Sequence, residues 1–118
     1  MNSKSLELAR PFLGQIVTVT MGRPLGSTHP KHGFLYEANY GYIEGFTAPD
    51  GEDLDAYYLG VNEPMDSAQG TCIAIIHRLN DDDDKLVVVP PGVEMSDEEI
   101  AKAVHFQEQF FKSEIIRI

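Results

Sequence analysis

Two runs of β-forming residues joined by a short polar segment constrain the fold of this chain more than any other feature. The first run extends from Thr71 to Leu79 and the second from Lys85 to Val89. Both are rich in Ile and Val, and the five polar residues from Asn80 to Asp84 lie between them. Two such runs separated by a short polar turn are typical of a β-hairpin. The sequence therefore predicts a paired sheet in the second half of the chain.

Further strands are predicted on the N-terminal side of this hairpin. Gln15 to Thr20 alternates in the manner of a strand, and Ala56 to Val61 is a second β-prone run. A short helical turn ending at Pro11 precedes them. The segment 62–70 is interpreted as a loop that Gly70 ends.

One helix is predicted late in the chain. Ser96 followed three residues later by Glu99 forms a capping box, and apolar residues recur at helical spacing from Ile100 to Phe111. The segment 115–118 is interpreted as a closing edge strand. Four or five short strands followed by one helix predict a mainly β (α+β) fold, a small closed or partly closed barrel with the helix packed on it. With 118 residues and 42% hydrophobic content, residues 1–118 are predicted to form a single domain around one core.

Four carboxylates are packed into six residues just ahead of the strand that begins at Ala56. They are Asp50, Glu52, Asp53 and Asp55. Carboxylates at such close range repel one another unless a cation lies among them, and oxygen ligands without Cys or His select Mg2+, Mn2+ or Ca2+ over zinc. The cluster therefore predicts a divalent metal site, and the alternative interpretation is a solvated acidic turn.

A second acidic cluster occupies the tip of the predicted hairpin, Asn80 to Asp84. On its own it is typical of a solubilising turn. It is not an EF-hand, because a loop starting at Asn80 or Asp81 has neither Gly at its sixth position nor Glu at its twelfth.

Charge and cysteine content exclude several classes of function. The formal charge of −10 argues against nucleic acid or an anionic membrane as a partner, because both require a basic surface. Cys72 is the only cysteine, so the chain has no internal disulfide and no zinc–cysteine site. Without a signal-peptide pattern or an apolar run of about 18 residues, a cytoplasmic location is predicted.

The segment 21–33 is predicted to be a loop or an irregular hairpin, because it is dense in Gly, Pro, Ser and His. It carries Arg23 and Lys31, which could bind phosphate, although solvated loop cations are the alternative interpretation. His29 and His32 lie beside a proline and a glycine, so helical metal-ligand spacing cannot be assumed for them, and neither receives a role.

Two motifs in the chain resemble those of the soluble family I inorganic pyrophosphatases. Asn39-Tyr40-Gly41-Tyr42-Ile43 precedes Asp50-Gly51-Glu52-Asp53-Leu54-Asp55-Ala56 at the spacing of the family signature. Glu52 stands where the family has its central aspartate, and Asp53 stands where it has proline or glutamate. Farther on, Asp83, Lys85 and Val89-Pro90 match an aspartate–lysine pattern and the strand that follows it. The resemblance implies a five-stranded, OB-like barrel with a C-terminal helix.

The resemblance also implies an activity, the Mg2+-dependent hydrolysis of inorganic pyrophosphate to two phosphates by a metal-activated water. Mn2+ is the expected substitute for Mg2+, and family members form homo-oligomers. The expected metal ligands are Asp50, Asp55, Asp83, Asp81 and Glu52. The first three would share the tightest ion, and Asp81, or its neighbour Asp82, would help to hold further ions.

Catalytic and substrate-binding residues follow from the same comparison. Glu52 matches the general base, Tyr40 the tyrosine beside the nucleophile, and Lys85 a phosphate-contacting lysine. The expected substrate contacts are Lys85, Lys112, Tyr36, Arg23 and Lys31, the last two as spatial substitutes for unmatched N-terminal residues of the family. Phe111 replaces a family tyrosine and so lacks its hydroxyl donor.

Two other functions remain open at this point. Glu52 and the unmatched N-terminal groups favour a hydrolase of another phosphoanhydride. A non-catalytic, metal-binding or partner-binding barrel is the alternative from a different class.

Overall fold

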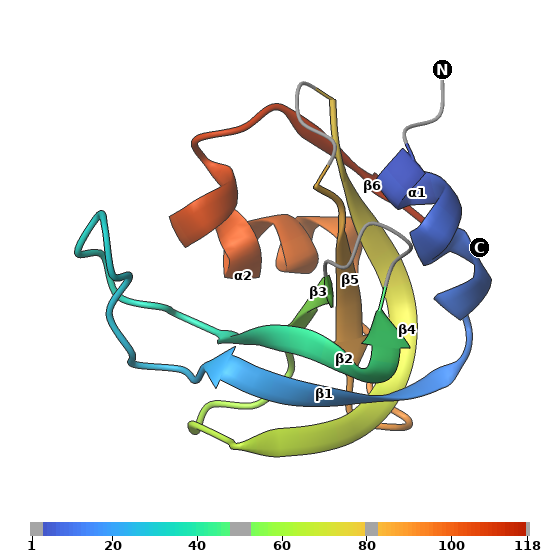
Figure 1. The fold of residues 1–118 in the computed structure, drawn as a ribbon, viewed down its shortest axis with the longest axis horizontal. Coiled ribbons are helices and arrows are strands. Elements are labelled where there is room, and N and C mark those ends of the chain that lie inside the picture. The colour runs from blue at the N-terminus through green and yellow to red at the C-terminus, as the bar shows by residue number, and fades with distance from the viewer. Residues whose placement is uncertain (1–3, 48–52, 80–82, 118) are drawn as a thin grey trace.

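A computed structural model of the chain describes residues 4–47, 53–79 and 83–117. These residues form six strands, two α-helices and one 3-10 turn, joined by loops (Figure 1). Along the chain they are α1 (Lys4–Ala9), η1 (Arg10–Phe12), β1 (Ile16–Arg23), β2 (Asn39–Thr47), β3 (Asp53–Tyr58), β4 (Ser67–Arg78), β5 (Lys85–Val89), α2 (Asp97–Glu108) and β6 (Ser113–Ile116).

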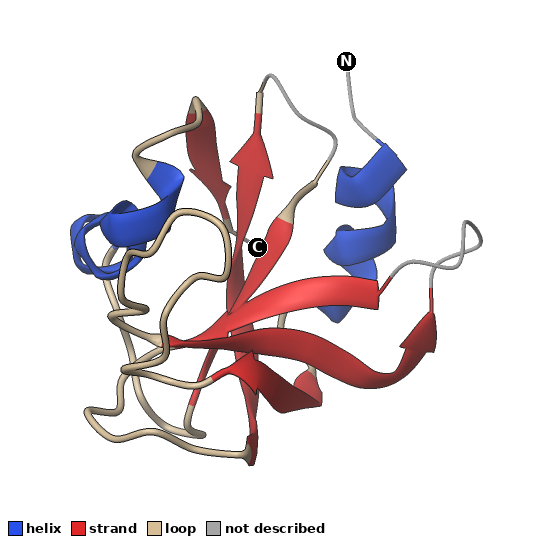
Figure 2. Cartoon of the chain, turned by 60° about the vertical axis from the view of Figure 1, so that its left-hand side comes forward, coloured by secondary structure: helices blue, strands red, loops and turns tan. Residues whose placement is uncertain are grey.

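Five of the strands close into a barrel. The strand order is β1-β2-β3-β5-β4, and β4 pairs back onto β1, while β6 adds to the outer edge of β4. Neighbouring strands are antiparallel except for β3 and β5, which run parallel. The strands curl around a common axis (Figure 2). The predicted five-stranded barrel, its β4–β5 hairpin and the closing edge strand are confirmed.

Several strand bounds differ from the sequence-based expectation. β1 continues to Arg23, into the segment 21–33 expected to be a loop or hairpin, and β3 spans Asp53–Tyr58 instead of Ala56 to Val61. Two further strands, β2 and β4, differ more. β2 was recognised only as a motif, and β4 begins at Ser67, within the segment expected to be a loop. Glycines explain both differences, because they allow backbones to approach where a side chain would clash. A Cβ on Gly41 would lie 1.8 Å from the carbonyl oxygen of Thr20, and one on Gly70 would lie 2.3 Å from that of Val89. These glycines permit close strand pairing instead of ending the strands.

Alternate side chains of the central strands enter two hydrophobic clusters. In β5, Leu86 and Val88 belong to one cluster, and Val87 and Val89 belong to the other. The first cluster draws residues from all five barrel strands and from α1, so it fills the barrel. The second includes residues of α2, so it lies between the barrel wall and that helix. Because β5 is buried on both faces, any polar residue in it must find a partner.

The helices cover opposite sides of the barrel, as both ribbon views show (Figures 1 and 2). The predicted capping box is present at the start of α2, where Ser96 and Glu99 each accept the backbone N–H of the other. The helix ends at Glu108, earlier than the expected Phe111, whose N–H instead donates to the Glu108 carbonyl. Among the described residues, no helix is long and apolar enough to cross a membrane.

Candidate active site

Asp55 and Lys85 lie next to each other because β3 and β5 run parallel. Tyr57 pairs with Val87, so the residues two positions earlier on each strand lie side by side at the same end of the sheet. Side chains two positions apart share a face of the sheet. Asp55 and Lys85 therefore point to the face that α2 covers, where Tyr57 and Val87 are buried.

Lys85 is a buried lysine held by two carboxylates. Its side chain is 2% exposed, and Nζ lies 2.8 Å from Oδ2 of Asp55 and 2.8 Å from Oδ1 of Asp83. An ammonium group removed from water requires such pairing. Because both oxygens contact one nitrogen, they lie no farther apart than twice that distance. The Asp55 and Asp83 side chains are 32% and 50% exposed, so both carboxylates remain accessible from outside.

Tyr40 completes this group from β2. Its hydroxyl donates to Oδ2 of Asp55 at 2.9 Å, the oxygen that also accepts from Lys85. Burial, and then the charge of Asp55, raise the pKa of Tyr40 well above its ordinary value. The phenol therefore stays protonated at neutral pH and acts as a donor.

Arg78, the last residue of β4, links Asp83 to α2. Its Nε and Nη2 donate to the two oxygens of Glu108 at 3.0 and 2.8 Å, and its Nη1 lies 3.5 Å from Oδ2 of Asp83. The guanidinium also stacks on Phe111, with Cζ 3.7 Å from the ring centroid. Glu108 is buried at the C-terminal end of α2, where the helix dipole disfavours a carboxylate, so the bidentate arginine compensates its charge.

A chain of hydrogen bonds leads from this ion pair across the buried face. The hydroxyl of Tyr57 donates to Glu108, Nε2 of Gln107 donates to the Tyr57 oxygen at 2.6 Å, and Tyr36 donates to Oε1 of Gln107 at 3.0 Å. Burial, and then the charge of Glu108, raise the pKa of Tyr57. The buried polar groups beneath the site thus form one connected network.

Asp84 points away from this group, which fixes the register at the end of the second acidic cluster. Its Oδ2 lies 2.9 Å from Nδ1 of His77, and its Oδ1 accepts the backbone N–H of Arg78 at 3.0 Å. Asp84 is buried, whereas its neighbour Asp83 turns toward Lys85. Of these two adjacent aspartates, Asp83 is therefore the one available to a ligand.

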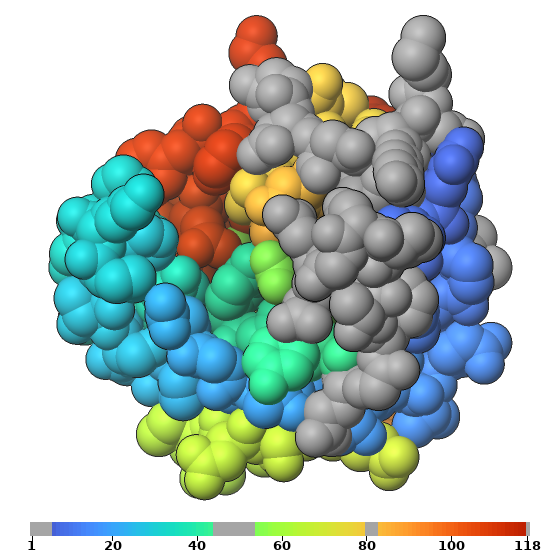
Figure 3. Space-filling model, in the orientation of Figure 1, coloured from blue at the N-terminus to red at the C-terminus, as the bar shows by residue number. Residues whose placement is uncertain are grey.

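A cavity of about 710 Å3 opens above these side chains. Its charged lining consists of Asp55, Asp83, Lys85 and Arg78, and its remaining described lining is Gln107 and the rings of His29, His32, Phe34, Tyr36, Tyr40, Phe110 and Phe111. In the space-filling view, the surface is hollowed between the cyan loop, the orange-red end of α2 and the green atoms of β2 and β3 (Figure 3). This volume falls within the range of roughly 300–1,000 Å3 that is typical of small-molecule sites.

The remaining predicted site residues are placed differently. Arg23 lines a smaller groove of about 230 Å3 together with Tyr36, Tyr40 and Asp55, so it adjoins the site. Lys31 is exposed on the loop 24–38. Lys112 lines a separate hollow beside α2 and β6, away from Lys85. Four expected carboxylates lie outside the described residues: Asp50, Glu52, Asp81 and Asp82.

The motifs in the sequence do not include four buried polar residues of this network: Arg78, Tyr57, Gln107 and Glu108. Arg78 ends a long apolar run, and Glu108 ends the helix, so each carries a charge at a position where burial is expected. Tyr57 and Gln107 sit among apolar residues at strand and helix spacing. A charged residue at the end of a buried element is the signal that could have identified this pair, but its partner depends on the tertiary fold.

The described residues fit a divalent cation in part. Asp55 and Asp83 offer oxygen ligands on one cavity wall, and Mg2+ is commonly bound by one or two carboxylates together with substrate phosphates. Within the described ranges, no group of three or more His, Cys, Asp or Glu side chains is placed to hold a metal ion. The described residues therefore supply two of the oxygen ligands that a divalent cation needs.

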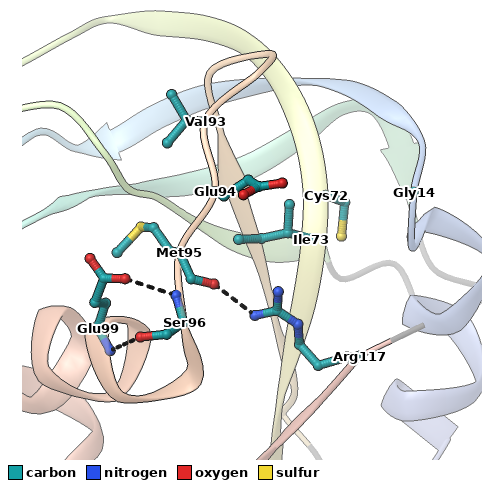
Figure 4. A pocket seen from close by; sticks show the side chains of 9 residues that line it. All are labelled: Gly14, Cys72, Ile73, Val93, Glu94, Met95, Ser96, Glu99 and Arg117. Atoms are coloured by element: carbon teal, nitrogen blue, oxygen red, sulfur yellow. Dashed lines mark hydrogen bonds between the residues drawn. The ribbon is translucent and has the colours of Figure 1, made fainter.

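A second cavity, of about 790 Å3, lies between the start of α2 and β4 (Figure 4). Three of its polar side chains already form hydrogen bonds within the fold. Ser96 and Glu99 form the capping box, and Arg117 donates to the carbonyl of Met95. Cys72 is fully buried in the barrel cluster, and burial raises its pKa to about 11. This cavity lacks the paired carboxylates and lysine of the first.

Solved structures of inorganic pyrophosphatases share this fold. The enzyme from Ehrlichia chaffeensis aligns with a TM-score of 0.64 at 16% identity, over 86% of this chain and 85% of that chain. The enzyme from Thermus thermophilus aligns at 0.63 and 16% identity, over 86% and 82%. The Neisseria gonorrhoeae enzyme aligns at 0.60 and 21% identity, over 79% and 72%. Among family models and curated protein sequences, none matches this chain. The resemblance seen in the motifs is therefore confirmed at the level of the fold.

Proposed function

We propose that this chain hydrolyses inorganic pyrophosphate to two phosphates in a Mg2+-dependent reaction. The observation that carries the proposal is the position of Lys85. It joins Asp55 and Asp83 at one wall of the 710 Å3 cavity, in a fold shared with inorganic pyrophosphatases. The two sequence motifs supply these three residues. Asp55 lies on β3, Lys85 lies on β5, and Asp83 lies in the segment just before β5.

Lys85 is suited to hold a phosphate oxygen. Its ammonium is fixed by two carboxylates, so it loses little rotational freedom when a ligand arrives. Asp55 and Asp83 would hold Mg2+ on the same wall, together with Asp50, Asp81 and Glu52, whose assignment rests on the sequence. When bound, Mg2+ neutralises phosphate charge and lowers the pKa of water toward neutrality.

Tyr40 and Arg78 keep the two aspartates in position. Tyr40 donates to Asp55 from one side, and Arg78 approaches Asp83 from the other while Glu108 and Phe111 hold its guanidinium. The phenylalanine that replaces a family tyrosine thus acquires a stacking role. Arg23 borders Asp55 and is the candidate for a further phosphate contact, whereas Lys31 and Lys112 remain predictions from sequence.

Phosphate release from pyrophosphate, measured with Mg2+ and with a chelator, tests the proposal. Asp55→Asn keeps the size of the side chain but removes its charge, so we expect turnover to fall at least about tenfold, as for the loss of one charge-assisted contact. Asp66→Asn is the matched control, because Asp66 is exposed and is not among the described residues lining the cavity. Equal turnover of the two variants, or release unaffected by the chelator, would contradict the proposal.

A further inference from the structure

Aromatic rings line much of the same cavity. His29, His32, Phe34 and Tyr36 belong to the loop 24–38, Phe110 follows α2, and Tyr40 belongs to β2. Tyr36 and Tyr40 lie between the other rings and Lys85. Neighbouring groups along this wall lie close together. Lys85 Nζ is 5.7 Å from the centroid of the Tyr40 ring, and the Tyr40 and Tyr36 ring centroids are 5.7 Å apart. The cavity therefore has a charged end and an aromatic end.

The aromatic wall continues from Tyr36 to the surface through two phenylalanines. Phe34 lies 5.7 Å from the Tyr36 ring and 6.0 Å from Phe110. Phe110 is 63% exposed, so its ring contributes little to the core. Apolar rings that face a cavity beside a few fixed charged groups are characteristic of sites for organic ligands.

His29 adds a neutral ring to this wall. Its Nδ1 accepts the backbone N–H groups of Lys31 and His32 at 3.1 Å each, so this nitrogen carries no proton. Desolvation, and then electrostatic interactions with His32, Arg23 and Lys31, lower the pKa of His29. A neutral imidazole whose orientation is fixed by two hydrogen bonds is suited to stacking. It is poorly suited to serve as a cation for a second phosphate.

Inorganic pyrophosphate has no apolar surface that these rings could contact. We propose that the site accepts a nucleoside 5′-diphosphate, with the base against Phe34 and Phe110 and the terminal phosphate at Lys85. Stacking on aromatic side chains tolerates any base, because every base has a π-face. The inference rests on the proposed function for its phosphoanhydride chemistry and extends it to an organic substrate.

The reaction is a hydrolysis without redox change. The oxygen of water forms a bond to the terminal phosphorus, and the bond from that phosphorus to the bridging oxygen breaks. The bridging oxygen leaves with the nucleoside monophosphate, and the proton lost from water passes to solvent at neutral pH. The products are one nucleoside monophosphate and one phosphate.

Phosphate release from ADP and from pyrophosphate, each with Mg2+, tests the inference on three variants. Phe110→Ala should lower the ratio of kcat/KM for ADP to that for pyrophosphate by roughly fivefold to a hundredfold, the range for one lost base–ring contact. Phe110→Trp should restore the ratio. Leu35→Ala should leave it unchanged, because Leu35 is equally exposed at 59% but is not among the described residues lining the cavity.

The outcomes separate this inference from the proposed function. Release from pyrophosphate but none from ADP, or release from ADP with an unchanged ratio in Phe110→Ala, would overturn the inference and leave the proposed function intact. If neither compound is hydrolysed, the proposed function and the hydrolysis of ADP both fail, and calorimetric titration with Mg2+ and ADP decides whether the cavity accepts the nucleotide. Binding that Phe110→Ala weakens supports the placement of the base, and absence of binding overturns the whole inference.

Discussion

Replacing Arg78 should destabilise the protein far more than replacing an exposed arginine. Arg78 and Glu108 are 5% and 6% exposed, and Arg78→Met would leave the Glu108 carboxylate buried with the Tyr57 hydroxyl as its remaining described partner. Removing one member of a buried ion pair costs about 3–5 kcal/mol in unfolding free energy. The lost stacking on Phe111 adds to this cost.

Glu108→Gln should be milder. The amide oxygen can still accept one hydrogen bond from Arg78, and Arg78 keeps Asp83 at 3.5 Å. The expected loss is about 1.5–3 kcal/mol, the value of a charge-assisted hydrogen bond. Because both substitutions remove the same interaction, the double variant should lose less than the two single losses added together.

Urea unfolding followed by circular dichroism measures these differences, since the chain has no tryptophan. Arg117→Met is the matched control. Arg117 pairs with Asp97 at 3.2 Å, but the two side chains are 39% and 61% exposed, so we expect a loss of about 0–1 kcal/mol. Losses from Arg78→Met and Glu108→Gln that simply add would refute the coupling, and equal losses from Arg78→Met and Arg117→Met would refute the burial argument.

Three further predictions concern ligand binding, pH and packing. Millimolar Mg2+ should raise the melting temperature, by an increment equivalent to about 2.7 kcal/mol at a hundredfold excess over Kd; a melting curve that ignores Mg2+ would argue against the metal site. Burial raises the pKa of Cys72 from 9.0 to about 11, so the stability that Cys72 contributes below pH 9 should be lost as pH rises toward 11. Cys72→Ala should reduce that loss in urea titrations at pH 8 and 10.5, and an identical pH dependence in both proteins would contradict this. Gly41→Ala should lower the unfolding free energy by more than about 3 kcal/mol, whereas Gly22→Ala, with open space around it, should not; similar urea midpoints for the two variants would show that β1 and β2 can separate at little cost.

The fold was predictable where the sequence carries its own periodicity. The run from Lys85 to Val89 and the capping box at Ser96 specify β5 and α2 from local residues alone. β2 could not be assigned as a strand in the same way. Its glycines weaken the strand signal, and Gly41 is required only because Thr20 of β1 approaches closely, which is a tertiary fact.

The candidate site was predictable through motifs and not through periodicity. Asp55, Asp83 and Lys85 were selected by spacing, and the parallel register of β3 and β5 brings Asp55 to Lys85. The Arg78–Glu108 pair lies 30 residues apart in sequence and depends on where α2 docks. Nothing in the local sequence of either residue identifies the other.

At Lys85 the same burial argument predicts a change in unfolding free energy of the opposite sign to that at Arg78. Its ammonium is buried, but its partners Asp55 and Asp83 are 32% and 50% exposed, so removing the lysine leaves no charge stranded in the interior. Lys85→Met should therefore leave the unfolding free energy unchanged or raise it slightly, in contrast to the loss of about 3–5 kcal/mol at Arg78. Turnover of pyrophosphate should nevertheless fall by about ten- to a hundredfold, since a charged phosphate contact is lost, while Lys31→Met on the exposed loop serves as the control for both measurements. A stabilised and inactive Lys85→Met would show that this lysine is kept for function at the expense of the fold, whereas a large loss of stability would mean that it holds the barrel together.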